Sequence, residues 1–160
     1  MSNPVIETRR LRLVLQTLEE VLAQIDAMSA GDRAHVSADW LARVRNATDA
    51  DPWVMGFAMV DRSTGAELGS CGFKGPPDAD GMVEIAYGVA PERQSNGYAT
   101  EAAEALVAYA FADSVVRLVR AHTLPEANAS TRVLTKCGFR RIGEVVDPDD
   151  GLVWRWERER

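Results

Sequence analysis

One segment of the sequence constrains the fold more than any other, because its periodicity changes twice. From Met82 to Val89 bulky and small or polar residues alternate, as in a strand. Residues 97–112 are rich in alanine and place apolar residues at helical spacing, and residues 115–123 are β-branched, as in a second strand. Strand, helix and strand within about 40 residues make a βαβ unit, whose strands are parallel and whose crossover is right-handed.

The segments on both sides of this unit are predicted to be antiparallel. Two apolar runs, 53–60 and 67–73, are separated by residues typical of a hairpin turn, and a second turn at 75–81 leads into Met82. The runs 139–146 and 152–157 predict a closing hairpin. The fold class is therefore α/β, a mixed sheet with an antiparallel N-terminal meander, a central βαβ crossover and a C-terminal hairpin, and not a doubly wound Rossmann sheet.

The first third of the chain is predicted to hold a half-buried strand at 11–15 and two helices. Apolar residues repeat at helical spacing over 18–28, and Gly31 is expected to stop that helix. Asp39 is expected to cap a second short helix that carries Trp40 and Val44. No linker or repeat interrupts the chain, so residues 1–160 are treated as a single domain.

Composition excludes several classes of protein. The chain is 46% hydrophobic and 26% charged, as ordinary globular proteins are, and its net charge of −6 argues against general nucleic-acid binding. No apolar run approaches the ~20 residues that span a bilayer, so we expect no membrane partner and a cytoplasmic location. Two distant cysteines, Cys71 and Cys137, make neither a zinc cluster nor a disulfide scaffold, so we expect no metal.

Basic residues are concentrated in one part of this acidic chain. Between Ser114 and Gly143 the only acid is Glu126, against six cations, Arg117, Arg120, Arg132, Lys136, Arg140 and Arg141. Two interpretations stay open. These residues are either solvated faces of helices and strands or part of a pocket for a small polyanion.

The loop between the predicted strand and helix, residues 93–99, is a candidate anion site. A helix N-terminus presents unpaired N–H groups and a partial positive charge, which together favour phosphate. Gly97 and the small Ala99 would let the backbone approach a diphosphate closely. The loop is neither a Walker loop nor a dinucleotide fingerprint, because it lacks Gly-Lys-Ser/Thr and has a single glycine.

Three segments together resemble one protein family. Residues 84–102 resemble the coenzyme A binding motif of the GNAT superfamily of N-acetyltransferases, Gln/Arg-x-x-Gly-x-Gly/Ala, which here reads Gln94-Ser95-Asn96-Gly97-Tyr98-Ala99. Residues 128–139 are similar to the second signature of that superfamily. Residues 6–13 are similar to the start of its ribosomal-protein-alanine N-acetyltransferase (RimJ/RimL-like) branch. The three matches follow the family order.

The resemblance implies acetyl-CoA as co-substrate and assigns residues to it. The backbone of the central strand would pair with the pantetheine arm, and the loop and helix start would hold the diphosphate. A family asparagine before the next helix, with the serine that follows it, would also contact the cofactor. The implied cofactor-binding residues are Tyr87, Val89, Gln94, Ser95, Asn96, Gly97, Tyr98, Ala99, Thr100, Asn128 and Ser130.

Two departures from the family pattern concern the second signature. The usual Asn-x-x-Ser is Asn128-Ala129-Ser130 here, so either Ser130 or Thr131 takes the place of the serine; counting back from Gly138 favours Ser130. Many relatives have a tyrosine at the position of Leu134, where it protonates the departing thiolate. The resemblance then implies Ser130 as the proton donor, and the alternative is that Ser130 is a plain N-cap.

Two residues are candidates for the general base. Glu84 faces the same way as Ala86 and Gly88, beside which an acyl-thioester arm could lie, and some relatives carry a catalytic glutamate on this strand. His122, on the next strand, is the other candidate because an unperturbed histidine pKa of about 6.5 suits proton transfer near neutral pH.

The predicted reaction is direct attack of a primary amine, a protein N-terminus or a small amine, on acetyl-CoA. The alternative is a non-catalytic acyl-CoA binding or sensor module. The sequence does not name the acceptor, and it leaves a homodimer open. Aspartates in two loops, Asp78 and Asp80 in one and Asp147, Asp149 and Asp150 in the other, are either an acidic rim that attracts a cationic amine or plain turn formers.

Overall fold

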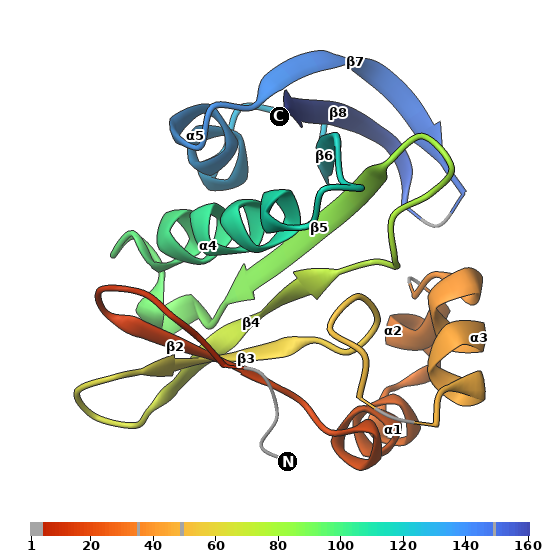
Figure 1. Cartoon of the computed structure of the whole chain (residues 1–160), viewed down its shortest axis with the longest axis vertical. Coiled ribbons are helices and arrows are strands. Elements are labelled where there is room, and N and C mark those ends of the chain that lie inside the picture. The colour runs from red at the N-terminus through yellow and green to blue at the C-terminus, as the bar shows by residue number, and fades with distance from the viewer. Residues whose placement is uncertain (1–4, 35, 49, 149) are drawn as a thin grey trace.

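The computed structural model describes residues 5–34, 36–48, 50–148 and 150–160 (Figure 1). Within these ranges the strands are β1 (Val5–Glu7), β2 (Leu11–Leu15), β3 (Phe57–Asp61), β4 (Glu67–Phe73), β5 (Met82–Val89), β6 (Leu118–Thr123), β7 (Arg140–Asp147) and β8 (Gly151–Glu159). The helices are α1 (Leu18–Ala27), α2 (Ala30–Ala34), α3 (Ala38–Asn46), α4 (Tyr98–Ala112) and α5 (Ala129–Lys136), with a 3-10 turn, η1, at Pro91–Arg93.

The strands form one mixed sheet in the order β1-β2-β3-β4-β5-β6-β8-β7. Strands β1 to β5 are antiparallel neighbours, β5 and β6 are parallel and joined through α4, and β8 pairs antiparallel with both β6 and β7. Figure 1 shows α4 lying along β5, α5 beside the β6–β8 part, and α1 to α3 grouped at the other end. The predicted meander, crossover and closing hairpin are confirmed.

The parallel pair β5–β6 opens after its first residues. In the described sheet, β5 pairs with β6 only at Met82, Val83 and Glu84, and beyond them it pairs only with β4. Backbone hydrogen bonds from Lys74 N–H to Glu84 and from Ala90 N–H to Leu68 show that the even-numbered residues of this stretch bond to β4. Along an antiparallel pair, residues that hydrogen-bond to the neighbouring strand alternate with residues whose backbone groups face away from it. The amide groups of Tyr87 and Val89 therefore point into the gap beside β6.

The core lies between the sheet and α4. Alternate residues of β2, Leu11, Leu13 and Leu15, are fully buried, as the strand period of two requires. The buried face of α4 is Ala102, Ala103, Leu106, Val107 and Ala110, whose small side chains let the helix lie close to the strands. This packing holds the N-terminus of α4 at the end of β5.

Two local predictions for the first third of the chain are wrong. Ser37 caps α3, because its hydroxyl accepts from the N–H of Trp40, while Asp39 lies inside the first turn. Gly31 does not stop α1; the chain leaves the helix at Met28, and Gly31 lies within α2, where the hydroxyl of Ser29 accepts from Asp32 N–H. In the part of the chain that the structure describes, no helix is long and apolar enough to cross a membrane.

Candidate active site

A cavity of about 330 Å³, which we call the α4–α5 cavity, opens between the end of β5, the loop that follows it and the two helices. Its base is the stretch of β5 whose amide groups face away from β4. Its lining is Tyr87, Gly88, Val89, Arg93, Gln94, Ser95, Gly97, Tyr98, Ala99, Thr100, Ala129, Ser130, Arg132, Val133 and Lys136. Three of these side chains are cations and none is an acid, so the cavity suits an anion.

The loop before α4 presents backbone to this cavity. Ser95 and Gly97 have φ angles of 66° and 81°, in the left-handed region. Gly97 is the N-cap of α4 and supplies no side-chain hydrogen bond, which leaves the first N–H groups of a 15-residue helix to a ligand or water. A Cβ on Gly97 would lie 3.2 Å from Nη2 of Arg10, so both backbone conformation and space favour glycine here.

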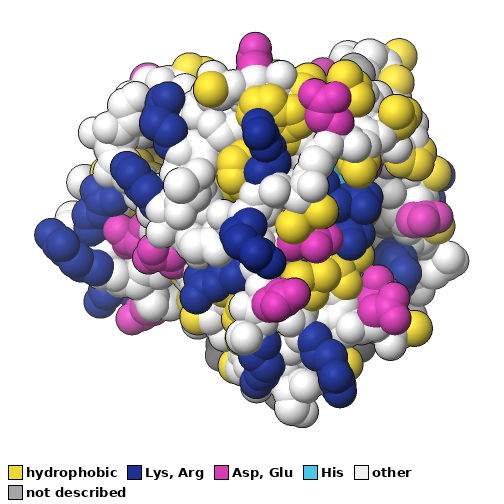
Figure 2. Space-filling view, turned by 90° about the horizontal axis from the view of Figure 1, so that it is seen from above, with side chains coloured by type: hydrophobic (Ala, Val, Ile, Leu, Met, Phe, Trp, Pro, Cys, Tyr) yellow, Lys and Arg dark blue, Asp and Glu magenta, His cyan; other side chains and the backbone are white. Residues whose placement is uncertain are grey.

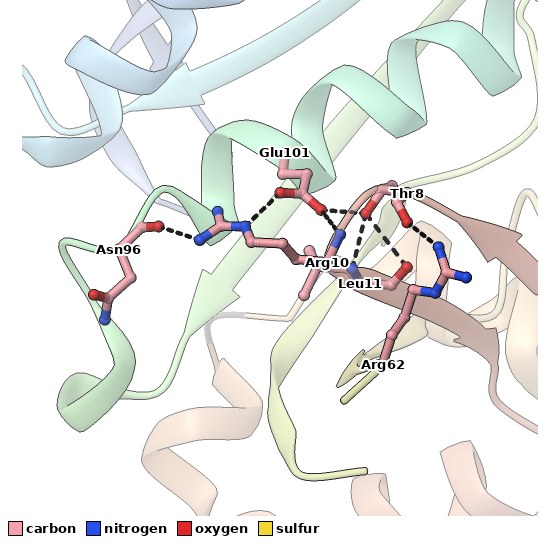
Figure 3. A network of polar contacts seen from close by, with 6 residues as sticks. All are labelled: Thr8, Arg10, Leu11, Arg62, Asn96 and Glu101. Carbon is pink, nitrogen blue, oxygen red and sulfur yellow. Dashed lines mark hydrogen bonds and ion pairs between the residues drawn. The ribbon is translucent and has the colours of Figure 1, made fainter. Parts of the chain in front are cut away.

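A network from the β1–β2 turn holds this loop and the start of α4 (Figure 3). Glu101, in the first turns of α4, accepts hydrogen bonds from the backbone N–H of Arg10 (2.8 Å), from Nε of Arg10 (2.8 Å) and from the hydroxyl of Thr8. Nη1 of Arg10 donates to the carbonyl of Asn96 at 2.8 Å, and its guanidinium lies over the ring of Tyr98. The Arg10–Glu101 network thus fixes the loop from outside.

At the start of α5 the two candidates for the family serine, Ser130 and Thr131, make different contacts. Asn128 caps the helix by accepting from Thr131 N–H, and the hydroxyl of Thr131 is used in the same capping box. Ser130 instead lines the α4–α5 cavity, with its Oγ 3.0 Å from the hydroxyl of Tyr87. Ser130 therefore faces the cavity and Thr131 faces the cap, while the role of Ser130 as the family serine stays a prediction.

The side chain of Tyr87 is a site residue that sequence reasoning missed. Only its backbone was predicted to act, yet its hydroxyl reaches Ser130 from β5, while Leu134 is fully buried in the core. Burial raises the pKa of Tyr87 to about 12, so this phenol stays protonated near neutral pH. The sequence holds one signal for this side chain: Tyr87 falls on the same face of the predicted strand as Val83, Ile85 and Val89.

The two candidate bases contact each other. Oε2 of Glu84 lies 3.0 Å from Nδ1 of His122 and 3.0 Å from Nζ of Lys74. Burial would raise the pKa of Glu84, but the hydrogen bond from His122 and the charge of Lys74 together lower it. Nε of Arg155 donates to Nε2 of His122, which assigns the proton to Nδ1 and leaves that ring with both nitrogens engaged.

A second cavity of about 450 Å³, the α1–α3 cavity, lies between β4, β5 and the first helices. It is lined by Gln16, Val21, Gln24, Val36, Ser37, Trp40, Val54, Gly56, Ser70, Cys71, Gly72, Phe73, Lys74, Ala86, Tyr87 and Gly88. Tyr87 and Gly88 line both cavities, so the two meet at β5.

Two of the loop aspartates accept hydrogen bonds within their turns, while attraction of a cationic amine by an acidic rim stays a prediction. Asp78 accepts from the N–H groups of Asp80 and Met82, and Asp147 accepts from Asp150 N–H, while Asp149 lies outside the described residues. Burial would lower the pKa of Lys74, but Glu84, Asp150 and Asp147 together raise it. The β7–β8 turn therefore also places negative charge near the α1–α3 cavity.

Most of the predicted cofactor residues lie together at the α4–α5 cavity. Asn96 and Asn128 do not line it; their side chains hold the loop carbonyls of Arg93 and Gln94 and cap α5. Of the six basic residues between Ser114 and Gly143, only Arg132 and Lys136 line the cavity. Figure 2 shows basic and acidic side chains interspersed over the face of α5 and β7, so the basic region is not a single patch.

Among the described residues no group of histidine, cysteine and acidic side chains could hold a metal ion.

The acetyltransferase (GNAT) domain family matches residues 12–140. The chain therefore belongs to the GNAT acetyltransferase family, as the three sequence segments predicted.

The chain is similar in sequence to two named N-acetyltransferases of Bacillus species. The chain is 27% identical over 156 residues to the uncharacterized N-acetyltransferase YjdG of Bacillus subtilis (strain 168), a match covering 84% of this chain and 88% of YjdG. It is 28% identical over 91 residues to the uncharacterized N-acetyltransferase p20 of Bacillus licheniformis; that match covers 57% of this chain and spans about half, 51%, of p20.

A solved structure of RimL, a ribosomal L7/L12 alpha-N-protein acetyltransferase in complex with coenzyme A, has the same fold. The two superpose with a TM-score of 0.71 over 98% of both chains, at 15% identity. The GNAT-like architecture is confirmed, and a neighbour in the branch that residues 6–13 resemble shares it.

Proposed function

We propose that this chain transfers an acetyl group from acetyl-CoA to a primary amine. One observation carries the proposal. A cationic cavity built on a helix N-terminus and a larger, mainly uncharged cavity meet at Tyr87 and Gly88, where a thioester and an amine could come into contact. Family membership and the RimL complex with coenzyme A support acetyl-CoA as the acetyl donor.

The α4–α5 cavity fits coenzyme A by the chemistry of its lining. The backbone of the loop and the free N–H groups of α4 would hold the diphosphate, with Arg93, Arg132 and Lys136 supplying positive charge. The amide groups of Tyr87 and the N–H of Val89, turned away from β4, would pair with the pantetheine arm, while the Val89 carbonyl accepts from Nε2 of Gln94 at 3.0 Å. One of these N–H groups would polarise the thioester oxygen.

The reaction needs a neutral amine nitrogen, because an ammonium has no lone pair for attack. We assign the acceptor of the amine proton to Glu84, acting through water, with His122 as a positioning residue that orients the carboxylate. The nitrogen attacks the thioester carbonyl carbon, an N–C bond forms, and the C–S bond breaks. The lowered pKa of Glu84 makes it a weak base, which suits α-amines of pKa about 8 better than lysine side chains of about 10.4.

The departing sulfur needs a proton, and we assign its donor to Ser130. When the Tyr87 hydroxyl donates to Ser130 Oγ, the serine proton is free to point at the sulfur. The high pKa of Tyr87 keeps it a hydrogen-bond donor throughout the working pH range. This pair supplies the hydroxyl that the helix tyrosine of many relatives would supply.

The test separates an enzyme from an acyl-CoA sensor. Acetyl-CoA is incubated with the protein and a panel of α-amines, lysine derivatives and polyamines, and free CoA thiol is measured together with acetylated product. Thiol release that needs both protein and amine supports the proposal. Calorimetric binding of acetyl-CoA with no transfer to any amine would establish the sensor instead.

A further inference from the structure

The α1–α3 cavity holds a buried polar side chain without a partner. Gln16 directly follows β2 and is 8% exposed. Its backbone N–H donates to Gly56, but within the described ranges nothing hydrogen-bonds its side-chain amide. The one fully enclosed side-chain polar atom left unpaired in that part of the chain is Nε of Arg33, so the Gln16 amide is open to the cavity.

The Gln16 amide reaches solvent through the cavity, so water bonds it in the free protein, and a ligand that displaces this water must replace its hydrogen bonds. A ligand that supplies both a donor and an acceptor would satisfy the Gln16 amide, since a carboxamide has an acceptor oxygen and a donor NH₂. The position of Gln16 therefore points to a neutral group with both functions on the ligand.

The rest of the lining describes the body of that ligand. Its walls are largely apolar, with Val21, Trp40, Val54 and Phe73 among them. Among the described residues that line the cavity, Lys74 is the one charged side chain, it is paired with Glu84 at 3.0 Å, and none is a carboxylate. A second cation buried against these walls would meet no carboxylate among them, since Asp147 and Asp150 of the β7–β8 turn lie outside the lining. A buried charge without a partner is strongly disfavoured.

We propose that the α1–α3 cavity takes amines that carry one carboxamide on an apolar, otherwise uncharged body, and that Gln16 selects them by pairing with that carboxamide. This inference rests on the proposed function, in which the same cavity receives the acceptor amine. It distinguishes such acceptors from polycationic amines, which the composition of the lining disfavours.

A double cycle between enzyme and substrate tests the role of Gln16. The probes are leucinamide and leucine methyl ester, which share the α-amine and the apolar side chain but differ in the amide N–H groups. The variant is Gln16→Met, which keeps the size and removes the polar atoms. With wild-type protein we expect kcat/KM for leucinamide to exceed that for the ester, and for spermidine, by about 10-fold, the effect of one good hydrogen bond.

In Gln16→Met the preference for leucinamide over the ester should disappear, because leucinamide loses both hydrogen bonds to Gln16 and the ester loses only the one that its carbonyl accepts. The Kd of acetyl-CoA should stay near wild type. Equal losses on both probes, or an unchanged preference, would overturn the inference. Faster acetylation of spermidine than of leucinamide by wild type would overturn it too.

A second variant moves Gln16 without replacing it. A Cβ on Gly56 would lie 2.9 Å from Oε1 of Gln16, the end of a flexible side chain that can move aside at little cost in stability. Gly56→Ala should therefore reduce the leucinamide preference with an unchanged melting temperature. Gly31→Ala, whose Cβ would meet only Oγ of Ser29 at 3.9 Å, is the matched control and should behave as wild type.

Failure of the proposed function is recognised separately. If wild-type protein releases no CoA with any amine, the two probes are compared by calorimetric binding to the protein in the presence of CoA. Tighter binding of leucinamide than of the ester, lost in Gln16→Met, keeps the assignment of Gln16. Equal binding of both probes refutes it.

Discussion

The two cavities that meet at β5 are built in different ways. The α4–α5 cavity is made mainly by one continuous stretch, from Tyr87 to Thr100, and much of its surface is backbone. The α1–α3 cavity is made by side chains from α1, α3, β4, β5 and the segments between them. A site formed by contiguous backbone leaves a motif in the sequence, because its glycines and its spacing are prescribed. A site formed by scattered side chains leaves none.

The cavities also differ in charge. Arg93, Arg132 and Lys136 give the α4–α5 cavity a positive lining, whereas the α1–α3 cavity carries one cation that is already paired. The first suits an anionic cofactor shared by a whole family, and the second suits a ligand recognised by shape and a few hydrogen bonds. Variants at the α4–α5 cavity should therefore change the Kd of acetyl-CoA, and variants on the other side of β5 should change kcat or kcat/KM.

The largest expected effect is on the cofactor side. Gly97→Glu places a carboxylate at the diphosphate position, on a backbone with φ of 81° and beside Arg10. We expect the affinity for acetyl-CoA to fall by more than about 100-fold, or ~2.7 kcal/mol. Calorimetry measures it, with Gly65→Glu as control, since Gly65 also has a positive φ of 75° but nothing near its Cβ position. Unchanged affinity in a folded Gly97→Glu variant would remove the cofactor assignment.

On the other side of β5, Glu84→Gln should lower kcat on the order of 100-fold, the usual contribution of a general base. The Kd of acetyl-CoA should stay near wild type, because Glu84 does not line the α4–α5 cavity. Steady-state kinetics and calorimetry measure the two constants. Wild-type turnover in this variant, together with loss of turnover in His122→Ala, would give the base role to His122.

Arg10→Gln should raise the Kd of acetyl-CoA by about 10-fold, since hydrogen bonds to charged groups contribute roughly 1.5–3 kcal/mol and exposure weakens them. The reason is that the Arg10–Glu101 network holds the loop, not that Arg10 touches the ligand. At saturating acetyl-CoA, kcat should be unchanged. The control is Arg12→Gln in the same hairpin, where the ion pair with Glu7 is half exposed on both sides. Equal effects of the two variants would contradict this role.

The smallest effect is a shift in pH dependence. Lys74→Met removes a positive charge that favours the ionised form of Glu84, so the pKa of Glu84 should rise. A base must be deprotonated to act, so the acid limb of kcat/KM should move to higher pH. Lys136→Met, in the α4–α5 cavity, should instead weaken acetyl-CoA binding and leave that limb in place. An acid limb that stays at its wild-type position in Lys74→Met argues that Glu84 is not the titrating base.

The features that could be predicted from the sequence are those built from neighbouring residues, as the α4–α5 cavity mainly is, and not those built from scattered side chains. The loop with Gly97, and Ser130 rather than Thr131 on the cavity wall, could be placed from neighbours within a few residues, while their binding and catalytic roles stay predictions. The cap at Asp39 was misplaced because Ser37 takes that role, and short polar residues are interchangeable at helix starts. The stop at Gly31 was misplaced because α1 ends at Met28 and Gly31 lies within α2. Gln16 carried no signal at all, because a glutamine after a strand is ordinary until its burial is known.

The sequence by itself determined the meander, the βαβ crossover, the closing hairpin and the family, but it did not predict β1 or α2. It also located the loop at 93–99, whose role in anion binding stays a prediction. Periodicity and turn chemistry are local, and a backbone site is encoded where it is built. Only the tertiary structure decided which distant side chains meet: Arg10 with Glu101, 91 residues apart; Tyr87 with Ser130; and Glu84 with Lys74 and His122. These contacts depend on where β5 parts from β6 and on how closely α4 and α5 pack against them, which is a property of the whole core.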